Sequence, residues 1–203
     1  MTAPTVDVID HLAGITPDSP LDSLRRRRPV TRAQLQASFD ALFAPVDDTA
    51  FPVRERALIA AFATRLTGDD PSAAFFAQRA RDIDPVRAEI VLAEAAEAAA
   101  PGPFGVYREA GLEGESTSGL RYAPSEAVRD AVGDRVAAGL AHAHLLVARP
   151  REAADEALDA LLDAGWSVDG IVTLAQLVSF LAFQQRVAAG LRALALTTTE
   201  VAA

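Results

Sequence analysis

The stretch Ser167–Leu194, SVDGIVTLAQLVSFLAFQQRVAAGLRAL, decides the fold of this chain. It reads as one helix, because Ser167 can act as its N-cap and because Trp166 and Ile171 have the spacing of a hydrophobic staple. The helix is apolar almost all the way round, which is typical of a helix in the middle of a domain. Its polar residues then need partners or a ligand. They are Thr173, Gln176, Ser179, Gln184 and Arg186.

Composition predicts an all-α protein. The chain has 203 residues, of which 50% are apolar and 6% aromatic, and residues 95–100 read AAEAAA. Alanine favours helix over sheet, and a chain of this length buries roughly 70% of the surface that its unfolded form exposes. We therefore expect one compact domain that needs neither a disulfide nor a metal for its stability.

Charge and cysteine content argue against several classes of function. The formal net charge is -9, so a nucleic acid is not an expected partner, because nucleic-acid binding depends on neutralising phosphates. Arg25–Arg28 is a local basic run that we expect to end a short helix and to meet nearby acids. The chain has no cysteine, which removes disulfides, thiolate nucleophiles and cysteine-ligated zinc. We expect no cofactor and no metal site.

The sequence predicts a cytoplasmic protein with no membrane partner. Residues 1–7 have neither a basic start nor an apolar core, so no signal peptide is visible. The longest apolar run, residues 171–183, is interrupted by polar side chains and is shorter than the ~20 residues that cross a bilayer.

Proline, glycine and capping residues divide the chain into four segments. Residues 1–45 form an N-terminal arm with short helices expected over 6–13, 21–27 and 31–43, the last with Thr31 as N-cap. Residues 46–100 form a first helical half, 101–124 a loop rich in glycine and proline, and 125–203 a second half. A loop of this length is typical of a lid or of a partly disordered segment. The aromatic residues that could hold it over a cleft, or pin it to the surface, are Phe104, Tyr107 and Tyr122.

Each half is expected to contain three helices in the same order. In the first half they begin at Pro52, at Asp70-Pro71 and at Asp84-Pro85, and the third runs to Pro101. In the second half they span 125–147, 150–165 and the final helix. Glu55-Arg56 before Pro71 matches Asp134-Arg135 before Pro150 at the same separation, which suggests an internal duplication.

Gln176, Ser179, Phe183 and Arg186 recur on the final helix at steps of three, four and three residues and so form one stripe. A buried guanidinium must be paired, and Glu55 and Asp134 are the expected partners of Arg186. One interpretation of the stripe is a buried polar contact between the halves or between subunits. The other is an anion-binding wall for a small ligand.

The histidines are weaker candidates. His142 and His144 lie about 200° apart around a helix, so they cannot chelate one metal. We expect His142 to point into the core or a cleft and His144 to be exposed or at an interface. If the chain is an enzyme, the candidate catalytic residues are Glu55, His142 and Arg186 around a common pocket.

The final helix pair resembles that of the carboxymuconolactone decarboxylase and alkylhydroperoxidase D superfamily. The resemblance rests on GWSVDGIV at 165–172, LAQLVSF at 174–180 and Arg186-Val187, with weaker support from DVIDHLAGI at 7–15 and from residues 51–68. Within that superfamily, the chain is similar to a cysteine-free, peroxidase-related branch. The resemblance implies an alkylhydroperoxidase D-like all-helical bundle with an internal repeat, assembled as a homo-oligomer.

The same resemblance implies that thiol peroxidase chemistry is absent. The superfamily motif has a glutamate, a Cys-x-x-Cys pair and a histidine. Anchored on Gly68, these positions fall on Ala57, Asp69, Ser72 and Phe76; anchored on Glu55, the cysteines fall on Thr67 and Asp70 and the histidine on Ala74. Neither alignment supplies the thiols that such a cycle needs. The Glu-Trp-x-x-His pattern of the decarboxylase branch is absent too.

Three functions therefore stay open. The leading one is a protein that binds a small anionic or apolar molecule between its halves, or that acts as the partner of a cysteine-bearing relative. The second is a cysteine-independent lyase or oxidoreductase. The third is a structural oligomer in which the stripe on the final helix is an interface.

Overall fold

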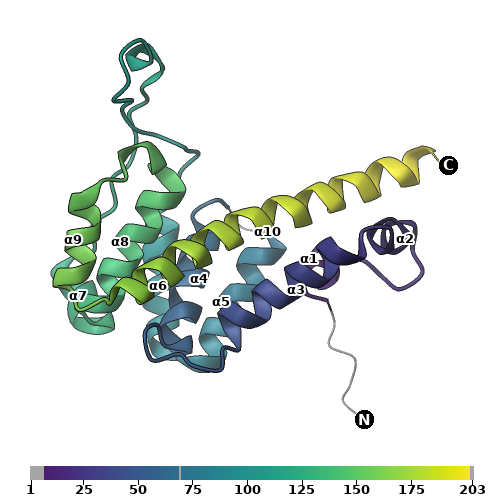
Figure 1. The fold of residues 1–203 in the computed structure, drawn as a ribbon, viewed down its shortest axis with the longest axis horizontal. Coiled ribbons are helices and arrows are strands. Elements are labelled where there is room, and N and C mark those ends of the chain that lie inside the picture. Colours follow the sequence, from purple (N-terminus) through teal and green to yellow (C-terminus); the bar gives the residue numbers. More distant parts are fainter. Residues whose placement is uncertain (1–6, 69, 202–203) are drawn as a thin grey trace.

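The computed structural model describes residues 7–68 and 70–201, with side chains as far as residue 197. Over these residues the protein is all-α, as predicted, with ten α-helices, two short 3-10 turns and no strand (Figure 1). The N-terminal arm forms α1 (Val8–Ala13), α2 (Pro20–Arg26) and α3 (Pro29–Phe43). Helix α3 begins before the predicted Thr31, because Pro29 at its first position fixes a helical φ.

The first helical half contains α4 (Val53–Arg65), α5 (Pro71–Ile83) and α6 (Pro85–Ala98). The predicted caps are confirmed, because the carboxylate of Asp70 accepts a hydrogen bond from the Ala73 amide (2.8 Å) and that of Asp84 from the Arg87 amide (3.2 Å). Helix α6 ends at Ala98, before the predicted Pro101.

The single helix predicted over 125–147 is wrong, since the chain forms two. The second half therefore has four α-helices, so the prediction of three helices in each half holds only for the first. Helix α7 (Glu126–Val132) and α8 (Asp134–Ala148) are separated by Gly133, whose φ of 89° lies outside the helical region and favours glycine. Pro150 opens only a 3-10 turn, Pro150–Glu152, and the next helix, α9, covers Asp155–Asp163.

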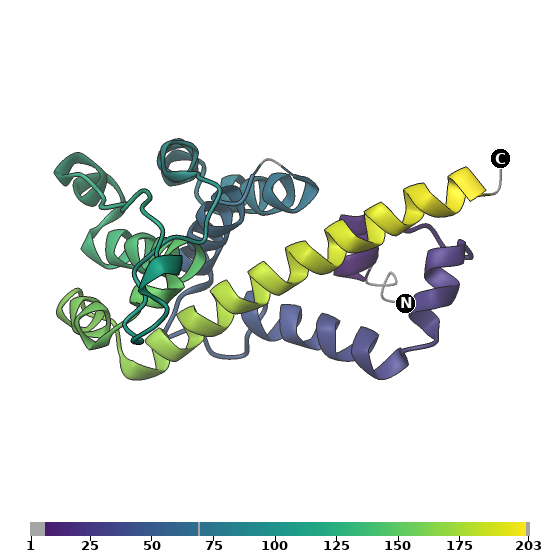
Figure 2. The ribbon, with the colours of Figure 1, turned by 90° about the horizontal axis from the view of Figure 1, so that it is seen from above.

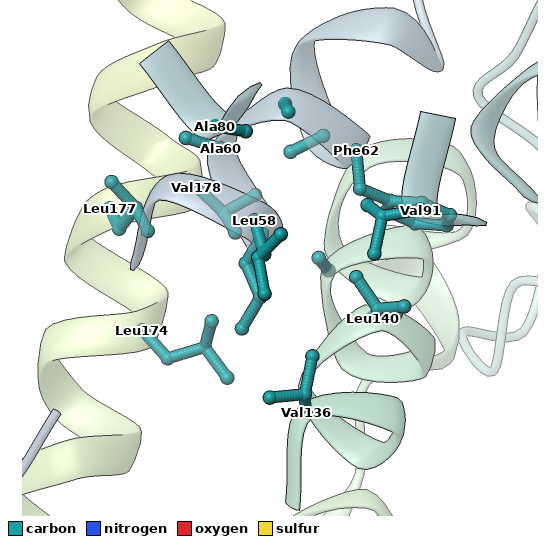
Figure 3. Close-up of a cluster of buried hydrophobic side chains, with 14 of the residues drawn as sticks. Leu58, Ala60, Phe62, Ala80, Val91, Val136, Leu140, Leu174, Leu177 and Val178 are labelled. Carbon is teal, nitrogen blue, oxygen red and sulfur yellow. The ribbon is translucent and has the colours of Figure 1, made fainter. Parts of the chain in front are cut away.

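Helix α4 lies at the centre of the core. It packs against α3, α5, α6, α8 and α10, and its residues from Arg56 to Thr64 are all buried. Figure 3 shows Leu58 of α4 between Leu174 and Leu177 of α10 on one side and Val136 and Leu140 of α8 on the other. One continuous cluster of buried side chains therefore joins the two halves.

Helix α10 (Val168–Val201) begins where predicted, and the Ser167 hydroxyl accepts a hydrogen bond from the Gly170 amide (3.2 Å). Its position differs from the prediction. The helix crosses one side of the molecule and extends past the body beside α1 and α3, instead of passing through the middle (Figure 2). Among the described residues, α4, α8, α9 and the N-terminal arm cover one side of it and leave the other side exposed.

By length and composition alone, residues 168–197 could cross a bilayer, and 39% of their most apolar window is buried. This differs from the sequence expectation, which considered only the apolar run over residues 171–183. A core helix of a soluble protein meets the same criterion, so cytoplasmic localisation stays a prediction.

Ion pairs fix the N-terminal arm, as expected for the basic run. The Arg25 guanidinium lies between the carboxylates of Asp7 (2.8 Å) and Asp10, and Arg26 pairs with Asp22 (2.7 Å). Asp10, Asp22 and Arg25 are buried. These arginines stabilise the arm.

The loop at 101–124 projects from the ends of α6 and α8 as a narrow arm (Figure 1). Gly105 and Thr117 form a backbone bridge, and the Phe104 ring lies against Gly119, where a Cβ atom would be 2.2 Å from it. Arg151 stacks on Tyr107 at 4.4 Å. Tyr122 packs at the base against Phe62, 5.1 Å between ring centroids. The three aromatic residues therefore hold the loop together and attach it to the helical body.

Candidate functional site

A cleft of about 620 Å³ opens between the two helical halves, and we call it the inter-half cleft. Its first wall comes from the end of α4 and the chain around residues 98–103, and its second from the end of α8. Helix α10 closes one side. Most of the lining is apolar, and the polar side chains on it are Thr67, Asp70, Ser179, Gln185 and Arg186.

Thr67 and Gln185 join the two halves inside this cleft. The Gln185 amide donates to the Thr64 carbonyl (3.0 Å), and the Thr67 hydroxyl lies 3.3 Å from the Gln185 Oε1 atom. The second amide hydrogen of Gln185 has no partner among the described residues, so it is available to a ligand. Asp70 is held by Arg192 at 3.4 Å.

Helix ends and charged side chains give the cleft charges of both signs. Helices α4, α6 and α8 end at its lining, where Leu66, Ala98 and Ala148 lie, and a helix C-terminus carries a partial charge of about −0.5. Asp70 caps the N-terminus of α5, which carries the opposite partial charge, and its carboxylate is paired with Arg192. Arg186 adds a further positive charge. These charges nearly balance, so the cleft favours a neutral group over an ion, which would lose its hydration in the apolar lining.

The predicted stripe is exposed in the single chain. Gln176, Ser179, Phe183 and Arg186 are all on the uncovered side of α10. Ser179 and Arg186 line the inter-half cleft, whereas Gln176 and Ser179 line a second cleft of about 630 Å³ against α3. The expected polar contact between the halves is thus wrong, and a contact between subunits stays a prediction. Phe183 is 47% exposed.

The predicted ion pairs of Arg186 are also wrong. Its guanidinium donates to the Ala182 carbonyl of its own helix (3.0 Å) and meets no carboxylate among the described residues. Glu55 pairs instead with Arg135 (2.9 Å). Arg135 also donates to the Ala50 carbonyl (2.7 Å), which ties the start of α8 to the segment before α4. The exposed helix face brings Arg186 near neither predicted acid.

His142 lines a different cleft, of about 540 Å³, formed by α7, α8 and α9. It is buried, as expected, and burial lowers the pKa of its imidazole. Asp134, Asp163 and Arg129 also line this cleft. Glu55 and Arg186 do not, so the three candidate catalytic residues share none of the clefts described above. The common pocket that the enzyme hypothesis needs is not formed in the single chain.

His144 is buried, contrary to the prediction of an exposed residue. It is 2% exposed, its ring packs 5.7 Å from that of Tyr122, and its Nε2 atom has no described partner. Burial, and next the nearby Arg149, lower the pKa of His144. Tyr122 donates its hydroxyl to Glu94 (2.8 Å), and burial raises its pKa. These residues form the base of the projecting loop.

The positions that would hold the superfamily motif are structural. Ala57 and Phe76 are fully buried in the core, and the Phe76 ring lies 5.2 Å from that of Phe43. Ser72 is fully buried and its hydroxyl has no described partner. Asp69 lies outside the described residues. With the other alignment, Thr67 and Asp70 both reach the inter-half cleft.

Sequence reasoning missed the importance of Gln185 and considered Thr67 only as a motif position. The pair of glutamines in an otherwise apolar helix was the available signal. The neighbouring Gln184 is fully buried, and neither atom of its amide has a described partner. The expectation that every polar group of the helix finds a partner is therefore not met at Gln184, and we have no physical account of it.

Comparisons of the chain with protein-family models, with curated proteins and with solved structures gave no match. The function proposed below therefore depends on the geometry of the inter-half cleft and on the sequence resemblance stated above.

Proposed function

We propose that this protein binds a small, mainly apolar molecule in the inter-half cleft. The observation that carries the proposal is the Thr67–Gln185 pair, which joins the two halves inside an apolar cleft of about 620 Å³. Pockets of roughly 300–1,000 Å³ with apolar walls and a few polar groups are typical of small-molecule sites.

The ligand's polar end is a neutral group that accepts a hydrogen bond, because the second amide hydrogen of Gln185 has no described partner. The cleft holds charges of both signs, and an ion would lose its hydration in the apolar lining. Of the two ligand classes expected from the sequence, the proposal therefore keeps the apolar one. Arg186 lies on the exposed face of α10, where its charge is available to other partners.

Three probes of equal chain length test the ligand class. Octylamine, 1-octanol and octanoate are titrated into the protein, and binding is measured by NMR chemical-shift changes and by the shift in Tm. We expect 1-octanol to bind more tightly than octylamine or octanoate. Tighter binding of either ion, or no binding of any probe, would overturn the proposal.

Two matched variants locate the site. Ala100→Phe places a ring in the cleft lining, whereas Ala96→Phe puts the same ring on the exposed face of α6. We expect the first variant to weaken binding of 1-octanol at least about tenfold, or ~1.4 kcal/mol. The second should bind as the unaltered protein does. Equal binding by both variants would place the ligand elsewhere.

We also infer that the scaffold is that of a cysteine-free carboxymuconolactone decarboxylase and alkylhydroperoxidase D-like protein, with an internal repeat. Support comes from the sequence of the final helix pair and from one arginine in each half. Arg56 and Arg135 both occupy first turns and donate to backbone carbonyls, at Phe51 (2.6 Å) and Ala50 (2.7 Å). An assay of organic hydroperoxide reduction with a thiol donor should give no turnover above buffer; clear turnover would contradict the inference.

A further inference from the structure

The exposed side of α10 has a repeat of its own that extends the predicted stripe. The exposed residues follow one another at steps of three and four, namely Asp169, Val172, Gln176, Ser179, Phe183, Arg186 and Gly190. This is the heptad spacing of a contact between two helices. The face is also poor in charge, because Arg186 is the only charged residue between positions 170 and 191.

Other exposed helices of this protein differ. Helix α9 has nine residues, and four of them are acids: Asp155, Glu156, Asp159 and Asp163. The α10 face instead exposes Val172 (51%) and Phe183 (47%), which stay open in the part of the chain that the structure describes. Ala175, Ala182 and Ala189 flank the stripe at intervals of seven residues and leave room for close approach.

The stripe is complementary to itself in an antiparallel arrangement. If a two-fold axis passes midway between Gln176 and Ser179, these two residues face each other across the axis, and Val172 faces Phe183. The same axis places Asp169 opposite Arg186. In heptad terms each pair joins an a position to a d position, which is the packing of antiparallel helices.

The two charges at the ends of this arrangement, Asp169 and Arg186, have no ion-pair partner among the described residues. Both side chains are exposed, and among those residues Arg186 donates only to the Ala182 carbonyl. They are 17 positions apart, or about 25 Å along a helix. One antiparallel pair of helices would form two such ion pairs at once, one at each end.

We propose that this face of α10 binds a second copy of the same chain, in an antiparallel pair centred between Gln176 and Ser179. Val172 and Phe183 exclude water from the contact, and Asp169 and Arg186 set its register. Ser179, Ala182, Arg186 and Ala189 also line the inter-half cleft, so the second copy would lie along its rim.

Charge reversal tests the register. Sedimentation equilibrium is measured for the unaltered protein, for Asp169→Arg, for Arg186→Asp and for an equimolar mixture of the two variants. Each variant alone places like charges at both ends and should weaken the dimer at least about tenfold. The mixture restores opposite charges at both ends and should form a heterodimer about as tight as the unaltered dimer. Arg108→Asp, a reversal on the exposed loop, should leave the dimer unchanged.

Disulfide trapping gives a second readout, with no background because the chain has no cysteine. Chains with Gln176→Cys mixed with chains with Ser179→Cys should cross-link on mild oxidation more than either variant alone. A monomeric unaltered protein, a mixture that does not re-associate, or the absence of this cross-link would overturn the proposal. Binding of the monomer to phosphatidylcholine vesicles through the same face would also overturn it, since the occupant would then be a membrane.

Discussion

Helices α4 and α10 differ in burial, and the difference is the opposite of what their compositions predict. Helix α4 carries Arg54, Glu55, Arg56 and Arg65, yet nine of its residues in succession are buried. Helix α10 is far more apolar, yet it leaves Val172, Phe183 and Leu196 exposed. A helix is buried when other elements surround it, and its own composition does not supply those elements.

The difference also separates residues that contribute to the free energy of folding from residues that can contribute to the free energy of binding. Residues of α4 contribute to folding of the single chain, because their contacts are all within it. Residues on the open side of α10 contribute little to folding and can contribute to binding. Three substitutions test this division between buried and exposed helix faces, and a fourth tests the burial of His144.

The largest effect is expected from Leu58→Ala on α4. Leu58 is fully buried between α8 and α10 (Figure 3), so its truncation leaves a cavity in the core. The free energy of unfolding should fall by about 2–5 kcal/mol, as measured by urea denaturation. Leu194→Ala on α10, where the side chain is 40% exposed, is the control and should cost much less. Similar losses for both would show that α10 is covered in the folded protein.

A smaller effect is expected from Gly139→Ala on α8. An added Cβ atom would lie 2.6 Å from Ile59 Cδ1 and 2.9 Å from Trp166 Cζ2, so these buried side chains, or the helices that carry them, would have to move. We expect a loss of about 1–3 kcal/mol. Gly190→Ala on α10 meets nothing within 4 Å and should stabilise the helix by about 0.5–1 kcal/mol. Opposite signs for the same substitution would confirm that only α8 is closely packed there.

The next effect depends on pH. Burial lowers the pKa of His144 in the folded protein, so below the unfolded value of 6.5 the unfolded chain binds more protons than the folded one. Its contribution is therefore fully present above pH 6.5 and is lost as the pH falls toward the folded pKa. His144→Leu should reduce the slope of stability against pH in this range, by at most about 1.4 kcal/mol per pH unit.

The smallest effect on folding is expected from Phe183→Ala. The ring lies on the open side of α10, so the stability of the monomer should change by less than about 0.5 kcal/mol. Denaturation at a protein concentration low enough to keep the chain monomeric measures this. The same variant should weaken the proposed dimer, and a large loss of monomer stability would instead assign the ring to the core.

Much of the fold could be predicted from the sequence because its signals are local. Asp70, Asp84 and Ser167 cap helices in the structure, as their side chains and the following prolines or apolar residues indicated. The break at Gly133 was missed, because a single glycine within a helical pattern does not reveal its φ. Locating the candidate site was harder, since Thr67 and Gln185 are 118 positions apart and only packing brings them together.

By itself, the sequence determined the all-α class, the approximate helix boundaries, the lack of thiol chemistry and the stripe on the final helix. These follow from backbone propensity, capping and residue chemistry, which act over a few positions. Only the tertiary structure decided that α4 is central and α10 peripheral, that Glu55 pairs with Arg135 and that His144 is buried. Such outcomes depend on which apolar surfaces pack against each other and exclude water. These surfaces come from distant parts of the sequence, so no local pattern specifies them.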